Sequence, residues 1–72
     1  MAVTLSPQMQ TRLEVMLSFE RRRRTYICTS DPTNRGLVAR GFVTRSDRYL
    51  SEASHTYVWA LTDTGREQAR NG

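Results

Sequence analysis

Lysine is absent from this 72-residue chain, and cysteine and histidine occur once each, as Cys28 and His55. A single cysteine cannot form an internal disulfide, which small secreted domains commonly need. A zinc site requires several cysteine or histidine ligands, so no metal centre is expected. No apolar stretch is long enough to span a bilayer, and the first residues lack the pattern of a secretion signal. We therefore expect a protein of a reducing, cytoplasmic compartment without a membrane partner.

Residues in a catalytic arrangement are also lacking. The sequence contains no Gly-x-x-x-x-Gly-Lys-Ser/Thr phosphate-binding loop. Neither His55 nor Cys28 has a neighbour in the sequence that is placed to activate it. Asp31, Asp47 and Asp63 stand at expected helix starts or in a turn, where hydrogen bonds to the backbone explain them. The chain is therefore not expected to be an enzyme, and no cofactor is implied.

Arginine supplies all of the basic residues. Eleven arginines against seven acidic residues give a formal charge of +4 and an isoelectric point of about 10.2. The planar guanidinium group suits phosphate, carboxylate and guanine edges. A basic small domain can therefore bind nucleic acid or an acidic protein surface. The lack of lysine is equally explained by the base composition of a GC-rich genome, so composition alone does not separate these interpretations.

One domain with a small core is expected, because a chain of this length buries only roughly 60% of its unfolded surface. Ser6-Pro7 combines a capping side chain with a proline at the first helical position, which is typical of a helix start. Apolar residues then recur at helical spacing, at Met9, Leu13, Met16 and Leu17. These features predict a helix over residues 7–22.

The densest charge in the sequence, Arg21–Arg24, lies where this helix should end. Four consecutive residues fan around most of a helix at 100° per residue, so they cannot form one face. Cations at this end complement the helix dipole, and Glu20 can pair with Arg23 or Arg24 at helical spacing. The run is interpreted either as a solvated helix end or as a cluster that contacts phosphates.

A short strand and a second helix are expected next. Thr25–Thr29 is rich in residues that favour strands. Ser30-Asp31-Pro32 repeats the signature of a cap followed by proline and predicts a helix over 32–40. Gly41 should end that helix in the left-handed conformation that glycine adopts freely.

The remaining third of the sequence predicts a β-hairpin and a last helix. The strands should cover 42–45 and 55–61, joined by a polar loop. Alternation places Tyr57, Trp59 and Leu61 on one side of the second strand, and this side should face the core. Thr62 should cap a short helix over 63–70.

Two segments carry a resemblance to a known family. Leu37-Val-Ala-Arg-Gly-Phe-Val43 and Ala60-Leu-Thr-Asp-Thr-Gly-Arg66 resemble the end of the recognition helix and the end of the wing in winged helix-turn-helix proteins of bacteria and phages, notably MarR- and PadR-like regulators. The resemblance covers about half of the chain. It implies an α+β winged-helix-like domain that binds DNA and regulates transcription. The chain departs from the family order because Asp31–Arg40 leaves room for only one of the two helices of the helix-turn-helix.

The resemblance also implies roles for individual residues. Thr33, Asn34 and Arg35, at the start of the recognition helix, would approach base edges or phosphates. Arg45 and Arg48, at the base and the tip of the wing, would reach the DNA backbone or the minor groove. Non-specific phosphate contacts would come from the arginine run, Arg21, Arg22, Arg23 and Arg24.

The alternative interpretation is a protein-binding module. Phages and mobile elements encode small proteins with a winged-helix core that inhibit host systems, including anti-CRISPRs, and a lone domain with a shortened helix-turn-helix suits that class. Tyr49 and Leu50 in the wing loop would then be the apolar anchors, unless the strands extend and fold them into the core. A homodimer formed through the first helix is compatible with either interpretation.

Overall fold

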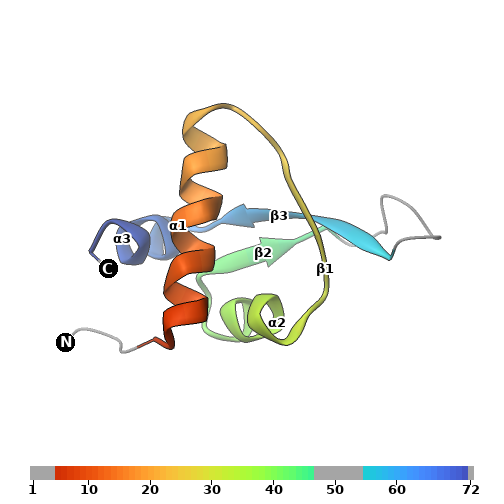
Figure 1. Ribbon diagram of the computed structural model, residues 1–72, viewed down its shortest axis with the longest axis horizontal. Helices are drawn as coiled ribbons and strands as arrows, with labels where there is room; N and C mark the ends of the chain where they lie inside the picture. Colours follow the sequence, from red (N-terminus) through yellow and green to blue (C-terminus); the bar gives the residue numbers. More distant parts are fainter. Residues whose placement is uncertain (1–4, 47–54, 72) are drawn as a thin grey trace.

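The computed structural model describes residues 5–46 and 55–71 of the chain. Helix α1 runs across the direction of strands β2 and β3, with the other two helices on either side of it (Figure 1). The fold is α+β in the expected order of helix, strand, helix, hairpin and helix, and the bounds differ from expectation by one residue at most. The elements are α1 (Pro7–Arg21), β1 (Tyr26–Thr29), α2 (Pro32–Ala39), β2 (Val43–Arg45), β3 (Thr56–Leu61) and α3 (Asp63–Asn71).

The helix starts and the end of α2 follow the expected local chemistry. The side chains of Ser6, Asp31 and Thr62 each accept a hydrogen bond from the backbone N–H three residues further on, at 3.3, 2.8 and 3.0 Å. These bonds satisfy N–H groups that have no partner inside the helix. Gly41 follows α2 with φ 77°, the left-handed conformation expected of it. Local sequence signals thus account for where the helices begin and where α2 ends.

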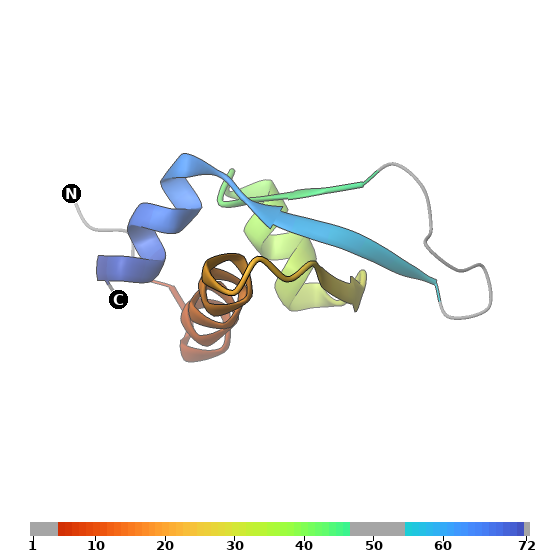
Figure 2. The same ribbon diagram turned by 90° about the horizontal axis from the view of Figure 1, so that it is seen from above.

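The hairpin belongs to a larger sheet. Strand β1 pairs antiparallel with β3, which makes a three-stranded sheet in the order β1-β3-β2. Tyr26 lies opposite Trp59, and Val43 lies opposite Leu61. Trp59 and Leu61 are buried and Tyr57 is half-buried, so the expected core-facing side of β3 is confirmed. The hairpin extends away from α1 and α3 toward one end of the molecule (Figure 2).

The core lies between the sheet and the helices. Leu13 and Leu37 are completely buried where α1 and α2 pack together. The indole N–H of Trp59 donates to the carbonyl oxygen of Cys28 at 2.8 Å, so its polar atom is satisfied within the interior. The buried apolar set is Leu13, Met16, Leu17, Leu37, Phe42, Val43, Trp59, Leu61 and Ala69.

Helix α3 packs unusually close to the start of β2. A Cβ atom on Gly65 would overlap the backbone carbonyl of Phe42 and lie 3.3 Å from Cδ2 of Leu61. The hydroxyl of Thr62 donates to the carbonyl of Gly41 at 2.7 Å, and the backbone N–H of Thr62 donates to the carbonyl of Phe42 at 3.0 Å. Because Gly65 has no side chain, the start of α3 can pack directly against the backbone of Gly41 and Phe42, which connect α2 to β2.

Candidate nucleic-acid interface

Helix α2 presents its residues in several directions. Successive residues turn by 100°, so Thr33, Asn34 and Arg35 cannot share one face. Arg35 is exposed, Thr33 is half-buried, and Asn34 is completely buried. In this arrangement Asn34 cannot reach a base edge, and only Arg35 of the three is fully presented to solvent.

Asn34 instead joins α2 to α1 and β1. Its Oδ1 accepts a hydrogen bond from the guanidinium of Arg12 at 2.7 Å, and its Nδ2 donates to the carbonyl of Thr29 at 2.9 Å. The same guanidinium lies 3.3 Å from the carboxylate of Asp31. Burial disfavours the charge on Arg12, but Tyr26 and Asp31 outweigh this effect and raise its pKa. The polar cluster thus fixes the start of α2 on the body of the domain.

Arg45 of β2 is held over an aromatic ring of the neighbouring strand. Its guanidinium carbon lies 4.3 Å from the centre of the Tyr57 ring, within the range of a cation–π contact. The rings of Tyr57 and Trp59 are arranged edge to face, with their centroids 6.0 Å apart and an interplanar angle of 75°. Arg45 remains exposed, so its guanidinium is oriented without being buried.

The structure brings Arg35 and Arg45 together. They border one shallow hollow of about 290 Å³ with Val38, whose side chain is 40% exposed. We call these three residues the α2–β2 surface. It combines two cations with an apolar side chain, and none of the described residues that line it is acidic. This surface can engage an anion that carries apolar or planar groups, as a nucleic acid does.

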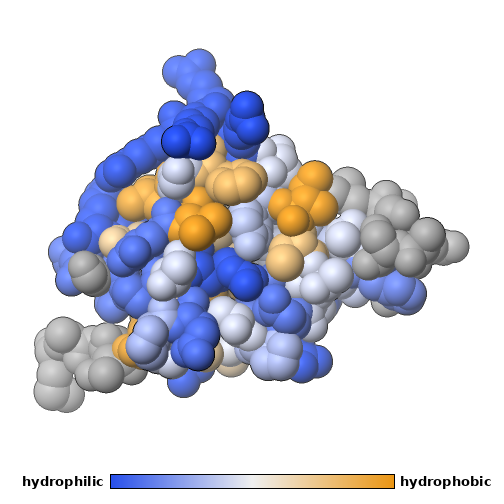
Figure 3. Space-filling model, viewed as in Figure 1, coloured by the Kyte–Doolittle hydropathy of each residue, from blue (hydrophilic) through white to orange (hydrophobic). Residues whose placement is uncertain are grey.

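The arginine run lies elsewhere. Arg21 closes α1, and Arg21–Arg24 are all exposed. Helix α2 packs near Arg12, and Arg21 is about 14 Å further along the α1 axis. Hydrophilic side chains surround this end of α1, with hydrophobic ones directly below it over α1 and β1 (Figure 3). The run and the α2–β2 surface are therefore separate.

Glu20 pairs differently from the expectation. Its carboxylate accepts hydrogen bonds from Nε of Arg66, at 2.9 and 2.8 Å to its two oxygens, rather than from Arg23 or Arg24. Helix α1 ends at Arg21, so the following arginines leave the helical spacing on which that pairing depends. The hydrogen bonds from Arg66 to Glu20, and its interaction with Asp63, raise the pKa of Arg66.

Three expected site residues, Arg48, Tyr49 and Leu50, lie outside the described residues. Cys28 lies in β1 and is half-buried, as expected for a strand residue. Within residues 5–46 and 55–71, no three His, Cys, Asp or Glu side chains form a group that could hold a metal ion. In the same part of the chain, no helix is both long and apolar enough to cross a membrane.

Sequence reasoning missed Val38 and the stacking of Arg45 on Tyr57. Val38 is exposed, because Asn34 and Leu37 occupy the buried positions of α2. The Arg45–Tyr57 contact depends on the pairing of β2 with β3, which local pattern does not specify. Comparisons with protein-family models, with curated proteins and with solved structures find no match to this chain.

Proposed function

We propose that the protein binds DNA through the α2–β2 surface. The observation that carries this proposal is that Arg35 and Arg45, from different elements, border the same hollow as the exposed Val38. Two forked donors on one surface suit adjacent phosphates, or one phosphate and one base edge. The net charge of +4 adds a long-range attraction for a polyanion. The resemblance of residues 37–43 and 60–66 to winged helix-turn-helix regulators favours the same function.

The aromatic support of Arg45 favours binding in a second way. A long side chain usually loses rotamer freedom when it contacts a ligand, and this loss weakens binding. The guanidinium of Arg45 already lies 4.3 Å from the centre of the Tyr57 ring. Part of the ordering is therefore complete before DNA arrives, which makes Arg45 the stronger of the two contacts.

Phosphate contacts should dominate over base reading. Helix α2 has eight residues and is only about 12 Å long, and it is the only described helix between β1 and β2. Asn34 is buried and held by Arg12, so the helix offers few side chains to the bases. We therefore expect modest selectivity for sequence and strong dependence on salt.

Titration of a labelled duplex of random sequence, followed by fluorescence anisotropy at several salt concentrations, tests the proposal. The binding constant should fall as salt rises, and each lost phosphate contact should flatten the logarithmic slope by about 0.9. The variant Arg35→Ala/Arg45→Ala should bind several-fold more weakly at low salt, with a flatter slope. The matched control Arg40→Ala/Arg70→Ala removes the same charge from exposed positions to which no DNA contact is assigned.

Equal effects of the two double variants would show that only net charge matters and that the α2–β2 surface is not the site. Absence of binding to the duplex at 50 mM salt or below would contradict DNA binding itself. All four side chains are exposed, so we expect each variant to keep the fold. Circular dichroism of each variant checks this.

A further inference from the structure

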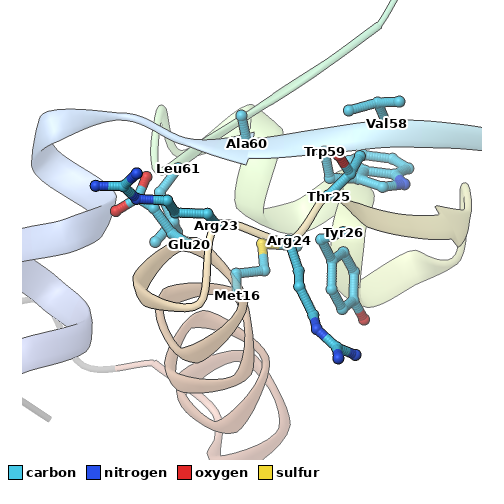
Figure 4. Close-up of a pocket in the computed structure, with 10 residues that line it drawn as sticks. All are labelled: Met16, Glu20, Arg23, Arg24, Thr25, Tyr26, Val58, Trp59, Ala60 and Leu61. Atoms are coloured by element: carbon cyan, nitrogen blue, oxygen red, sulfur yellow. The ribbon is translucent and has the colours of Figure 1, made fainter.

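A groove separate from the α2–β2 surface lies between the end of α1, the turn that follows it, and β3. Its volume is about 290 Å³. Figure 4 shows its lining, in which Met16 of α1 and Tyr26 of β1 lie near Trp59 and Leu61 of β3. We call it the α1–β3 groove. Its volume is near the lower end of those of ligand pockets, so it can take one large side chain rather than an extended molecule.

The floor of the groove is apolar. Met16 and Trp59 are each 3% exposed, and Leu61 is 6% exposed. The indole N–H of Trp59 already donates to the carbonyl of Cys28, so it is not available to a ligand. The floor therefore favours an apolar side chain over a base edge, whose donors and acceptors would lose water without gaining partners.

Two cations stand at the rim. Arg23 and Arg24 both line the groove and are exposed. Their guanidinium groups point away from each other, that of Arg23 toward the Glu20 side and that of Arg24 beside the Tyr26 ring (Figure 4). Neither forms an ion pair with any residue that the structure describes.

Glu20, the acidic residue among the described residues of the lining, pairs with Arg66, which also pairs with Asp63. The carboxylate of Glu20 accepts hydrogen bonds from Nε of Arg66 at 2.9 and 2.8 Å. Arg66 offsets part of the charge of Glu20, so Arg23 and Arg24 leave an excess of positive charge on the described lining of the groove. An apolar cleft with a cationic rim is complementary to an apolar side chain flanked by carboxylates.

The backbone of Arg23 gives an independent indication. Its φ is 57°, and it occupies the position after the helix cap where glycine is preferred. Its N–H donates to the carbonyl of Glu20 at 2.9 Å, and the N–H of Arg24 donates to the carbonyl of Phe19 at 2.8 Å. A side chain in this left-handed conformation is strained. The chain thus places a cation on the rim of the groove at a position where glycine would be more stable.

We propose that the α1–β3 groove binds an acidic peptide segment of a protein partner. One large apolar side chain of the segment enters the floor between Met16 and Leu61. Carboxylates on either side of it pair with Arg23 and Arg24. This interaction uses the arginine run, which the α2–β2 surface leaves free, so the two surfaces can be occupied at the same time.

A surface-displayed library of random twelve-residue peptides, selected on the full-length chain, tests this proposal. Enriched peptides should carry Asp or Glu on both sides of one Leu, Met, Phe or Trp. Replacing that apolar residue by serine should weaken binding about tenfold, because burying a large apolar side chain is worth about that factor. No enrichment, or enrichment of basic or purely polar peptides, would overturn the proposal.

The variant Arg23→Gly separates loss of binding from loss of folding. It removes a rim cation and relieves the left-handed strain, so an enriched peptide should bind about twofold to fivefold more weakly while thermal stability is kept or rises. Arg24→Ala should weaken the peptide by a similar factor, and Arg35→Ala/Arg45→Ala should leave its affinity unchanged. Unaltered peptide binding by Arg23→Gly would contradict the assignment.

Nuclear magnetic resonance then locates the ligand on the protein. Trp59 is the only tryptophan of the sequence, and its indole N–H gives a single signal beside the groove. An enriched peptide should change the chemical shift of this signal and those of the backbone amides around Tyr26. If duplex DNA shifts the same signals and displaces the peptide, the groove is a nucleic-acid site and the proposal of a protein partner is wrong.

Discussion

Replacement of Gly65 by alanine would place a methyl group against the carbonyl of Phe42 and 3.3 Å from Cδ2 of Leu61. The first neighbour is backbone, so it cannot rotate away, and α3 must move from the start of β2. Strain of this kind costs up to about 3 kcal/mol, or occasionally more. A domain of 72 residues has a free energy of unfolding of about 4–11 kcal/mol. We expect a loss of about 3 kcal/mol and a melting temperature lower by about 12 °C or more.

Urea unfolding followed by the fluorescence of the buried Trp59, with circular dichroism as a second probe, measures this loss. Gly36→Ala is the matched control, since the atoms nearest to a Cβ at Gly36 are the flexible end of Met9 and, at 3.4 Å, Nη1 of Arg40. The gain in helix propensity of about 1 kcal/mol offsets the displacement of Met9, so this variant should stay close to the parent. A Gly65→Ala variant as stable as Gly36→Ala would refute the close-packing argument.

Two further predictions concern the interior around Arg12. Asn34→Ala should lower the free energy of unfolding by about 2 kcal/mol or more, because it removes the acceptor of Arg12 and the donor to Thr29. Urea titration measures this loss, and an unchanged midpoint would contradict the role of the cluster. Burial raises the pKa of the Tyr26 phenol although Arg12 opposes the shift. The fold therefore favours the neutral phenol, so its contribution to stability is complete below about pH 10, the ordinary value for tyrosine, and is lost as pH rises through the higher folded value. Melting temperatures should decline less in this alkaline range for Tyr26→Phe than for the parent, and parallel declines would contradict the prediction.

Part of the α2–β2 surface could be predicted from the sequence. Arg35 and Arg45 were assigned from their places on the helix and the wing strand, and the structure brings them together. The resemblance groups Thr33 and Asn34 with Arg35 because all three lie at the start of the expected recognition helix. The turn of 100° per residue separates these three side chains, and the interior of the domain takes Asn34.

The α1–β3 groove could not be predicted from the sequence. Its floor combines residues of α1, β1 and β3, whose contact depends on how the helix lies across the sheet. The arginine run was recognised as dense charge, but its place beside an apolar cleft is a property of packing. The strained conformation of Arg23 is likewise visible only in the backbone angles.

Local signals determined the elements of this protein. Caps at Ser6, Asp31 and Thr62, the left-handed Gly41 and the alternation along β3 act over a few residues, so they can be read from neighbours in the chain. Tertiary structure alone decided the pairing of β1 with β3, the pairing of Glu20 with Arg66, and which arginines remain free. These outcomes depend on contacts between residues far apart in the sequence. Burial and charge compensation determine which residues pair, and the local sequence pattern does not distinguish between the possible partners.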